Sequence, residues 1–327
     1  MYGCHVSKIS NILDDPNKKR KTMIEAIKKD VEIMKLSCIQ IFIQGPRNST
    51  MSNIDYNGIK KYCSDKNINL YVHSSYITVG IFSITSVNKN EDKSKFALTN
   101  LVNQMEACDK LNAKGFVVHL SKKSPAEIID TMKVIIPFIK KFKTPLVFEQ
   151  PAKKPDGDQT YETSEKINNL TNLINTKFPK YTNWYWCIDT CHLWSAGIEM
   201  NKKKIVDNWL NDIKYIKKIG LFHLNGGSND IFNTGKDKHI VPFSSDDNIW
   251  GEIFVKNTVE KKYDSNNDTY IERIISERKF DYEKYKESSM FSIHNFCKKN
   301  NIDSILEINR GSINDIEFAF EVLFKLG

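Results

Sequence analysis

The sequence lacks the features that would place a protein in or across a membrane. No stretch of its 327 residues approaches the roughly 20 consecutive apolar residues of a membrane-spanning helix. The first ten residues, MYGCHVSKIS, lack the basic, apolar and small-residue blocks of a secretion signal. With 40% hydrophobic and 27% charged residues, the chain is expected to be globular, with no membrane partner.

A disulfide framework is also missing. The seven cysteines are odd in number and widely scattered, which is expected in a reducing intracellular compartment. Cys187 and Cys191 flank Asp189 but lack the C-x-x-C spacing of common zinc motifs. We therefore interpret them as buried free thiols.

The third absence concerns nucleotide cofactors, because no glycine-rich phosphate turn follows the first strand-like run. This disfavours a dinucleotide-binding open sheet. Eight apolar or β-branched runs instead alternate with amphipathic segments, as is typical of a TIM-type (β/α)8 barrel. The runs are Gly3–Val6, Cys38–Ile43, Asn69–His73, Gly115–Leu120, Pro145–Glu149, Tyr185–Asp189, Ile219–Leu224 and Ser304–Ile308.

One interval interrupts this alternation. From about residue 250 to residue 303 the chain is polar and charge-dense, and it includes the helix-compatible pieces Tyr270–Arg278 and Met290–Lys299. We interpret the interval as an elaboration before the last strand, because long excursions in compact domains are usually surface features. The prediction is a single domain over residues 1–327.

The formal net charge of +8 would attract a polyanion such as nucleic acid. A coding bias towards AT-rich codons would produce the same lysine excess without any partner. Charge alone leaves both interpretations open.

The strongest signal is where metal-binding residue types fall. Six predicted strands end at or near a histidine, aspartate or glutamate, and in a parallel barrel these ends meet at one rim. A single carboxylate there could simply cap the following helix. Several buried carboxylates without cations would be very unfavourable, and metal ions remove that cost. The six residues are His73, His119, Glu149, Asp189, His223 and Glu307.

Two short spacings extend this set. Asp189 and His192 are three apart in a strand-to-helix turn, and Asp237 and His239 are two apart in an extended segment, so each pair can face one side. Histidine and carboxylate ligands favour zinc, with manganese or iron as substitutes, and nine ligands suggest two or three ions. Such a cluster carries a small positive charge that suits a phosphodiester, and zinc supplies hydroxide near neutral pH.

These residues lie in segments that resemble the endonuclease IV family, the zinc-dependent apurinic/apyrimidinic (AP) endonucleases of family 2. The segments are GCHVS, QIFIQGPRN, YVHSSY, VVHLS, VFEQPA, CIDTCHLWSAG, HLN, DKH and ILEINRGS, in collinear order over nearly the whole chain. The resemblance implies a xylose-isomerase-like TIM barrel holding three zinc ions, with manganese possible at one site.

The resemblance also implies which residues hold each ion. His73 and His119 would bind one zinc with a bridging Glu149. The other oxygen of Glu149, with Asp189, His223 and Glu307, would bind a second, and His192, Asp237 and His239 a third. Glu149 and Glu307 are the ligands expected to be catalytic.

The family's activity would be hydrolysis of double-stranded DNA 5′ to an abasic site, leaving a 3′ hydroxyl and a 5′ deoxyribose phosphate. Trimming of blocked 3′ ends could accompany it. Arg47, Tyr76 and Ile77 match the side chains that the family inserts at the lesion. We expect the protein to act as a monomer.

The sequence departs from the common bacterial pattern in three places. Gly226-Gly227-Ser228 follows HLN where an aspartate usually stands, so a partner of the ligands could be missing. IVPFSSDDNIWG replaces a glycine-rich stretch after His239, which puts the DNA-contacting loop there in doubt. The span to Glu307 is long.

The GPR triplet and ILE-x-N resemble the large DNA virus branch, which would place the protein in the host cytoplasm or nucleus, a viral factory or a virion.

Two other functions remain open. A metal-dependent sugar isomerase or epimerase of the same barrel superfamily should have fewer ligands and lack the His192, Asp237 and His239 group. A damaged-DNA-binding homologue without catalysis should have an eroded ligand set. His5 and His294 fall outside the matched ligands, and we interpret them as a rim residue and an ordinary helix residue.

Overall fold

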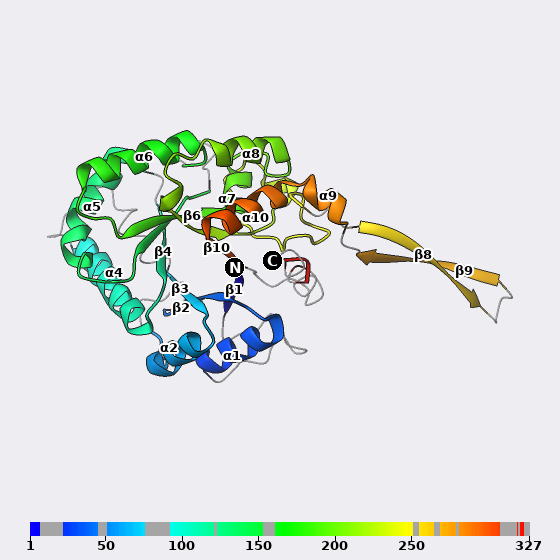
Figure 1. The fold of residues 1–327 in the computed structure, drawn as a ribbon, viewed down its shortest axis with the longest axis horizontal. Helices are drawn as coiled ribbons and strands as arrows, with labels where there is room; N and C mark the ends of the chain where they lie inside the picture. Colours follow the sequence, from blue (N-terminus) through cyan, green and yellow to red (C-terminus); the bar gives the residue numbers. More distant parts are fainter. Residues whose placement is uncertain are drawn as a thin grey trace.

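The computed structural model describes residues 1–6, 22–44, 51–75, 92–120, 123–152, 161–250, 255–264, 269–278, 281–307, 319 and 321–323. Within these residues, eight parallel strands close into a barrel in the order β1, β10, β7, β6, β5, β4, β3, β2. The predicted TIM-type (β/α)8 fold is therefore confirmed (Figure 1). The barrel strands are β1 (Tyr2–Val6), β2 (Cys38–Phe42), β3 (Asn69–His73), β4 (Gly115–His119), β5 (Leu146–Glu149), β6 (Trp184–Asp189), β7 (Ile219–His223) and β10 (Asp303–Leu306).

Helices cover the outside of the barrel (Figure 1). Helix α5 illustrates how the sequence sets their bounds, because Ser124 and Glu127 form a reciprocal capping box and Pro125 opens the first turn. Its apolar stripe, which includes Ile128, Met132 and Ile135, is buried. The helices are α1 (Met23–Met34), α2 (Tyr56–Asp65), α4 (Asp92–Leu111), α5 (Pro125–Ile139), α6 (Ser164–Lys177), α7 (Thr190–Ser195), α8 (Lys203–Asn211), α9 (Tyr282–Lys286) and α10 (Ser289–Asn300), with short 3-10 turns η1 (Ile216–Lys218) and η2 (Asn229–Ile231).

The barrel interior is layered, because inward-facing residues of a strand are two apart. One layer is apolar or uncharged and fully buried, and it consists of Cys38, Tyr71, Val117, Val147, Cys187, Leu221 and Ile305. Two residues further along each of the same strands stands a polar residue, which gives a second layer of Gln40, His73, His119, Glu149, Asp189, His223 and Glu307. The polar layer therefore rests on a closed apolar floor.

The opposite, amino-terminal end of the barrel holds a buried carboxylate, that of Asp303. Its Oδ2 accepts hydrogen bonds from Asn69 Nδ2 at 2.8 Å, Tyr71 Oη at 2.8 Å and Lys114 Nζ at 2.9 Å. Hydrogen bonds and a cation together offset the cost of burying this charge. The cluster ties β10 to β3 and to the start of β4.

Part of the interval before the last strand folds differently from our expectation. The helix-compatible piece Tyr270–Arg278 is not helical, because it lies in strand β9 (Thr269–Arg278), which pairs antiparallel with β8 (Val255–Asp264). The spacing of its isoleucines fits a helix, but β-branched residues also favour a strand. The pairing with β8 determines that the segment is a strand. The helix expected at Met290–Lys299 is confirmed as α10.

The β8–β9 hairpin projects away from the barrel (Figure 1). Its strands contact mainly each other. We propose that it is a surface elaboration of a single domain. Replacing residues 255–278 by a short Gly-Ser linker should therefore change the Tm by less than about 2 °C in a thermal melt, and a fall of more than about 5 °C would contradict this.

Candidate metal centre

The nine ligands predicted from the sequence lie together at the carboxyl end of the barrel. They form groups whose ligand atoms all lie within 4.8 Å of one another. The three groups that the nine residues form are His73, His119 and Glu149; Glu149, Asp189, His223 and Glu307; and His192, Asp237 and His239.

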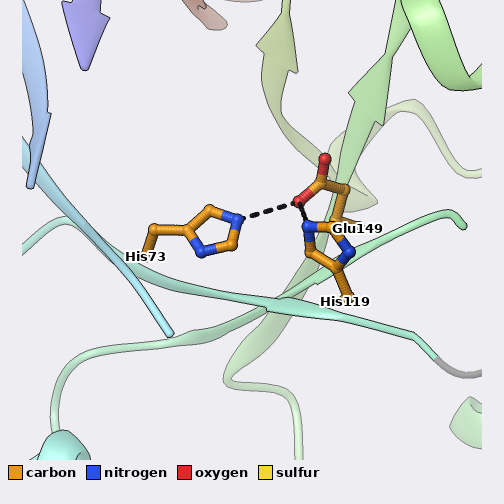
Figure 2. A group of neighbouring side chains, drawn as sticks. All are labelled: His73, His119 and Glu149. Carbon is orange, nitrogen blue, oxygen red and sulfur yellow. Dashed lines mark hydrogen bonds and ion pairs between the residues drawn. The ribbon is translucent and has the colours of Figure 1, made fainter. Parts of the chain in front are cut away.

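Glu149 connects the first two groups. It ends β5 and is completely buried. Its Oε2 lies 3.2 Å from His73 Nε2 and 3.0 Å from His119 Nε2 (Figure 2), while its Oε1 lies 3.1 Å from His223 Nδ1. Burial would raise the pKa of Glu149, but His119 and His223 hold it well below its usual range. The carboxylate presents one oxygen to each group, which is the arrangement needed to bridge two ions.

The two carboxylate oxygens of Asp189 have different roles, one in capping a helix and one in the metal-binding groups. Oδ1 accepts a hydrogen bond from the His192 backbone N–H at 2.8 Å and so caps helix α7. Oδ2 lies 3.7 Å from His223 Nδ1 and 3.6 Å from His239 Nε2. Capping and ligand geometry, treated above as alternatives, coexist in this residue.

The third group combines α7 with the loop after β7. His192 Nε2 and His239 Nε2 lie 3.4 Å and 2.9 Å from the same oxygen, Asp237 Oδ1. Both nitrogens are buried, and neither has a hydrogen-bond partner of satisfactory geometry among the described residues. Two buried imidazole nitrogens that converge on one carboxylate oxygen fit a divalent cation of the zinc type.

The remaining ring nitrogens show which lone pairs are available. Backbone carbonyls hold the Nδ1 atoms of three histidines: Ser74 O for His73 at 2.8 Å, Gln150 O for His192 at 2.8 Å, and Glu307 O for His239 at 3.2 Å. An Nδ1–H that donates to a carbonyl leaves Nε2 as the acceptor that can bind a metal.

Sequence reasoning missed three amide side chains that orient the ligands. Gln40 Oε1 lies 3.0 Å from His223 Nε2, and Gln40 Nε2 donates to Glu307 Oε1 at 2.6 Å. Asn225 Nδ2 donates to Asp189 Oδ2 at 2.6 Å, and Asn225 Oδ1 accepts from the Glu307 N–H at 2.9 Å.

The third of these amides is Gln150. Its side chain bonds both backbone groups of Asp189, donating to the carbonyl at 2.8 Å and accepting from the N–H at 3.0 Å. The sequence contained a signal for these residues. Gln150 and Asn225 stand in the segments FEQP and HLN, which also carry the ligands Glu149 and His223. Gln40, in QIFIQ, stands two residues after a buried strand residue, the same position that the ligands occupy on their strands. Such partners commonly set ligand orientation and metal affinity.

Other residues singled out in the sequence are not among these nine ligands. The His5 Nδ1 atom lies 3.3 Å from Gln40 Nε2. Burial lowers the pKa of His5 to about 4. His294 sits in α10 and bonds the hydroxyl of Tyr2. Cys191 Sγ lies within 4.8 Å of ligand atoms of Asp189 and His239. It contacts the Lys238 carbonyl at 3.5 Å, and burial raises the pKa of this thiol well above its usual value, which disfavours a thiolate ligand. Arg47, Tyr76 and Ile77 lie outside the described residues.

In the described part of the chain, no helix combines the length and apolarity needed to cross a membrane.

Comparison with known proteins agrees with this geometry. The profile of a family described as xylose isomerase-like TIM barrel matches residues 12–256. "Probable endonuclease 4" of Mycoplasma mobile is 31% identical over 63% of this chain and 71% of its own length. "Probable AP endonuclease" of African swine fever virus (isolate Pig/Kenya/KEN-50/1950) is 24% identical over 87% and 83%. The crystal structure of AsfvAP:AG superposes with a TM-score of 0.74 at 21% identity, covering 100% of this chain and 98% of that one.

Metal binding at this site should be coupled to proton release. Burial lowers the pKa of His239, but Asp189 and Asp237 raise it to about 9, so its imidazole is protonated at pH 7 without metal. A metal needs the neutral ring, so binding must displace that proton and must weaken as the pH falls below about 9. Calorimetric zinc titrations of metal-free protein at pH 7, in buffers of different ionisation enthalpy, should show this release, and buffer-independent heats would contradict it.

Proposed function

Because the chain belongs to the endonuclease IV family of xylose isomerase-like TIM barrels, we propose that it cuts DNA 5′ to abasic sites with a cluster of three zinc ions. The coarser assignment, an endonuclease IV-type hydrolase, follows from the family. The finer proposal rests on one observation, the grouping of nine ligand-type side chains into three neighbouring sets, two of which share Glu149.

In the proposed cluster, His73, His119 and Glu149 hold one ion, the other oxygen of Glu149 with Asp189, His223 and Glu307 holds a second, and His192, Asp237 and His239 hold the third. Bound zinc would supply hydroxide at neutral pH and stabilise the leaving 3′ oxygen. The products would be a 3′ hydroxyl and a 5′ deoxyribose phosphate.

The chain's own residues prepare this chemistry. Gln40 and Asn225 fix the Glu307 and Asp189 carboxylates, so these ligands need not reorganise when substrate binds. Glu149 and Glu307 are the proposed catalytic carboxylates, since both contact His223 at the centre of the cluster. Asp237, with 42% of its side chain exposed, makes the third site the most open, and we propose manganese exchange there.

The same site would trim blocked 3′ ends, because a 3′ blocking group presents the same kind of phosphoester bond to the cluster. The substrate would be double-stranded DNA, and the net charge of +8 favours that polyanion. Arg47, Tyr76 and Ile77 remain the proposed side chains that insert at the lesion. We further propose that the protein works as a monomer in a reducing intracellular compartment.

The two alternatives are less well supported. A sugar isomerase of the same superfamily would not need the group formed by His192, Asp237 and His239, yet its ligand atoms converge here. An inactive DNA-binding homologue would not need to retain nine ligands.

Incubating the purified, zinc-loaded protein with a duplex that carries one tetrahydrofuran abasic analogue tests the proposal. We expect a single cut 5′ to the analogue, with a 3′ hydroxyl end. An intact duplex, together with isomerisation of a ketose by the same sample, would favour the isomerase.

Glu149→Gln should reduce nicking by at least about a thousandfold, because an amide nitrogen cannot replace the bridging oxygen and several kcal/mol of transition-state stabilisation are lost. Glu106→Gln is the matched control, since Glu106 lies exposed on α4 and forms an ion pair with Lys110 on the same helix. Full activity of the Glu149→Gln variant in a gel-based nicking assay would show that the proposed bridge is wrong.

A further inference from the structure

Two of the nine proposed ligands lack a strand or helix to hold them. Asp237 and His239 lie in the segment between η2 and β8, whereas the other seven stand at strand ends or on α7. A ligand in a loop must be fixed by contacts from outside that loop if its geometry is to be preformed. The question is which contacts fix this segment.

The first contact is a short antiparallel bridge next to His239. The Gly226 N–H donates to the Ile240 carbonyl at 2.8 Å, and the Ile240 N–H donates to the Gly226 carbonyl at 3.1 Å. Gly226 directly follows Asn225, which orients Asp189 and Glu307. The bridge therefore joins the loop ligands to the turn that orients the second ligand group.

The second contact is the buried carboxylate of Asp247, which is 1% exposed and forms no ion pair with any cation of the described chain. Oδ1 accepts from the N–H groups of Gly227 at 3.2 Å and Ile249 at 3.0 Å. Oδ2 accepts from Phe243 at 2.8 Å and Trp250 at 3.3 Å. Four N–H donors offset the burial of one carboxylate and tie the 243–250 segment to the turn after β7.

The carboxylate of Asp247 packs directly against the backbone of Gly226. A Cβ atom at Gly226 would lie 2.7 Å from both Asp247 Cγ and Asp247 Oδ1, and 2.9 Å from the Ile240 carbonyl oxygen. Such distances are far below van der Waals contact. The Asp247 carboxylate therefore occupies the space that a side chain at position 226 would need.

We infer that Asp247 is a positioning residue: it ties the turn at Gly226 and Gly227 to the 243–250 segment and so fixes Asp237 and His239. The inference rests on the proposed function, because it concerns the third metal group. Asp247 touches neither metal nor substrate in this scheme. It acts by holding the Gly226–Ile240 bridge and the loop beyond it.

The test is zinc release from the loaded protein into excess chromogenic chelator, followed by stopped-flow absorbance. In the Asp247→Ala variant we expect about one third of the zinc to leave at least about tenfold faster, with the rest leaving at the wild-type rate. Added zinc should restore part of the nicking activity. Zinc release identical to wild type in all phases would overturn the inference.

Asp303→Ala is the matched control, because Asp303 is an equally buried carboxylate with several donors at the opposite end of the barrel. It should lower the Tm without accelerating zinc release. Equal acceleration in both variants would show that Asp247 acts only through general stability. If Asp247→Ala does not fold, Asp247→Asn retains shape and one acceptor oxygen, and it should still release the third ion faster.

A double-mutant cycle tests the shared space independently of metal. Gly226→Ala should lower the Tm more in the wild type than in the Asp247→Ala background, because the clash with the carboxylate is then gone. Additive changes in Tm would show that the Asp247 carboxylate does not occupy the space that a side chain at position 226 needs. Wild-type protein that takes up no zinc would instead overturn the proposed function, and that outcome is separate from unchanged zinc release in Asp247→Ala.

Discussion

A fully buried carboxylate above an apolar floor cannot remain charged without compensation, and Glu149 is that carboxylate. Histidines from β3, β4 and β7 lie beside its two oxygens. Side chains from three barrel strands therefore surround the charge of Glu149. Without metal, His73 and His223 compensate for this charge, because neighbouring carboxylates, those of Glu149 and Glu307, counteract burial and raise the pKa of both imidazoles. In the proposed cluster, the same oxygens would bridge two ions. The remaining ligands are arranged around this one group.

The register of the barrel makes the arrangement possible. Because each of seven strands places a polar residue two positions after a buried floor residue, ligands from distant parts of the chain meet in one layer. Hydrogen bonds then fix which ring nitrogen of each histidine faces the cluster. Carbonyls hold one nitrogen of His73, His192 and His239, and Gln40 holds one nitrogen of His223.

The sequence was sufficient for the parts that depend on local pattern. Eight apolar or β-branched runs, six of which end at or near a ligand-type residue, predict both the barrel and the position of its rim, and the observed strand ends lie within two residues of the expected ones. Parts that depend on pairing between distant segments were not predictable in this way. Residues 270–278 carry spacing that fits a helix, and only their pairing with β8 makes them a strand. Asp247 resembles an ordinary loop aspartate until Gly226 is seen beside it.

Asp189 has a consequence for how the protein responds to its ions. One carboxylate caps helix α7 through Oδ1 and faces the cluster through Oδ2, so helix formation and metal binding use the same side chain in the same position. Each would therefore stabilise the other, because both need a fixed Asp189 carboxylate. Since α7 also carries His192, an ion in the second group would help to order a ligand of the third, and filling of the cluster would be cooperative through a single turn of helix.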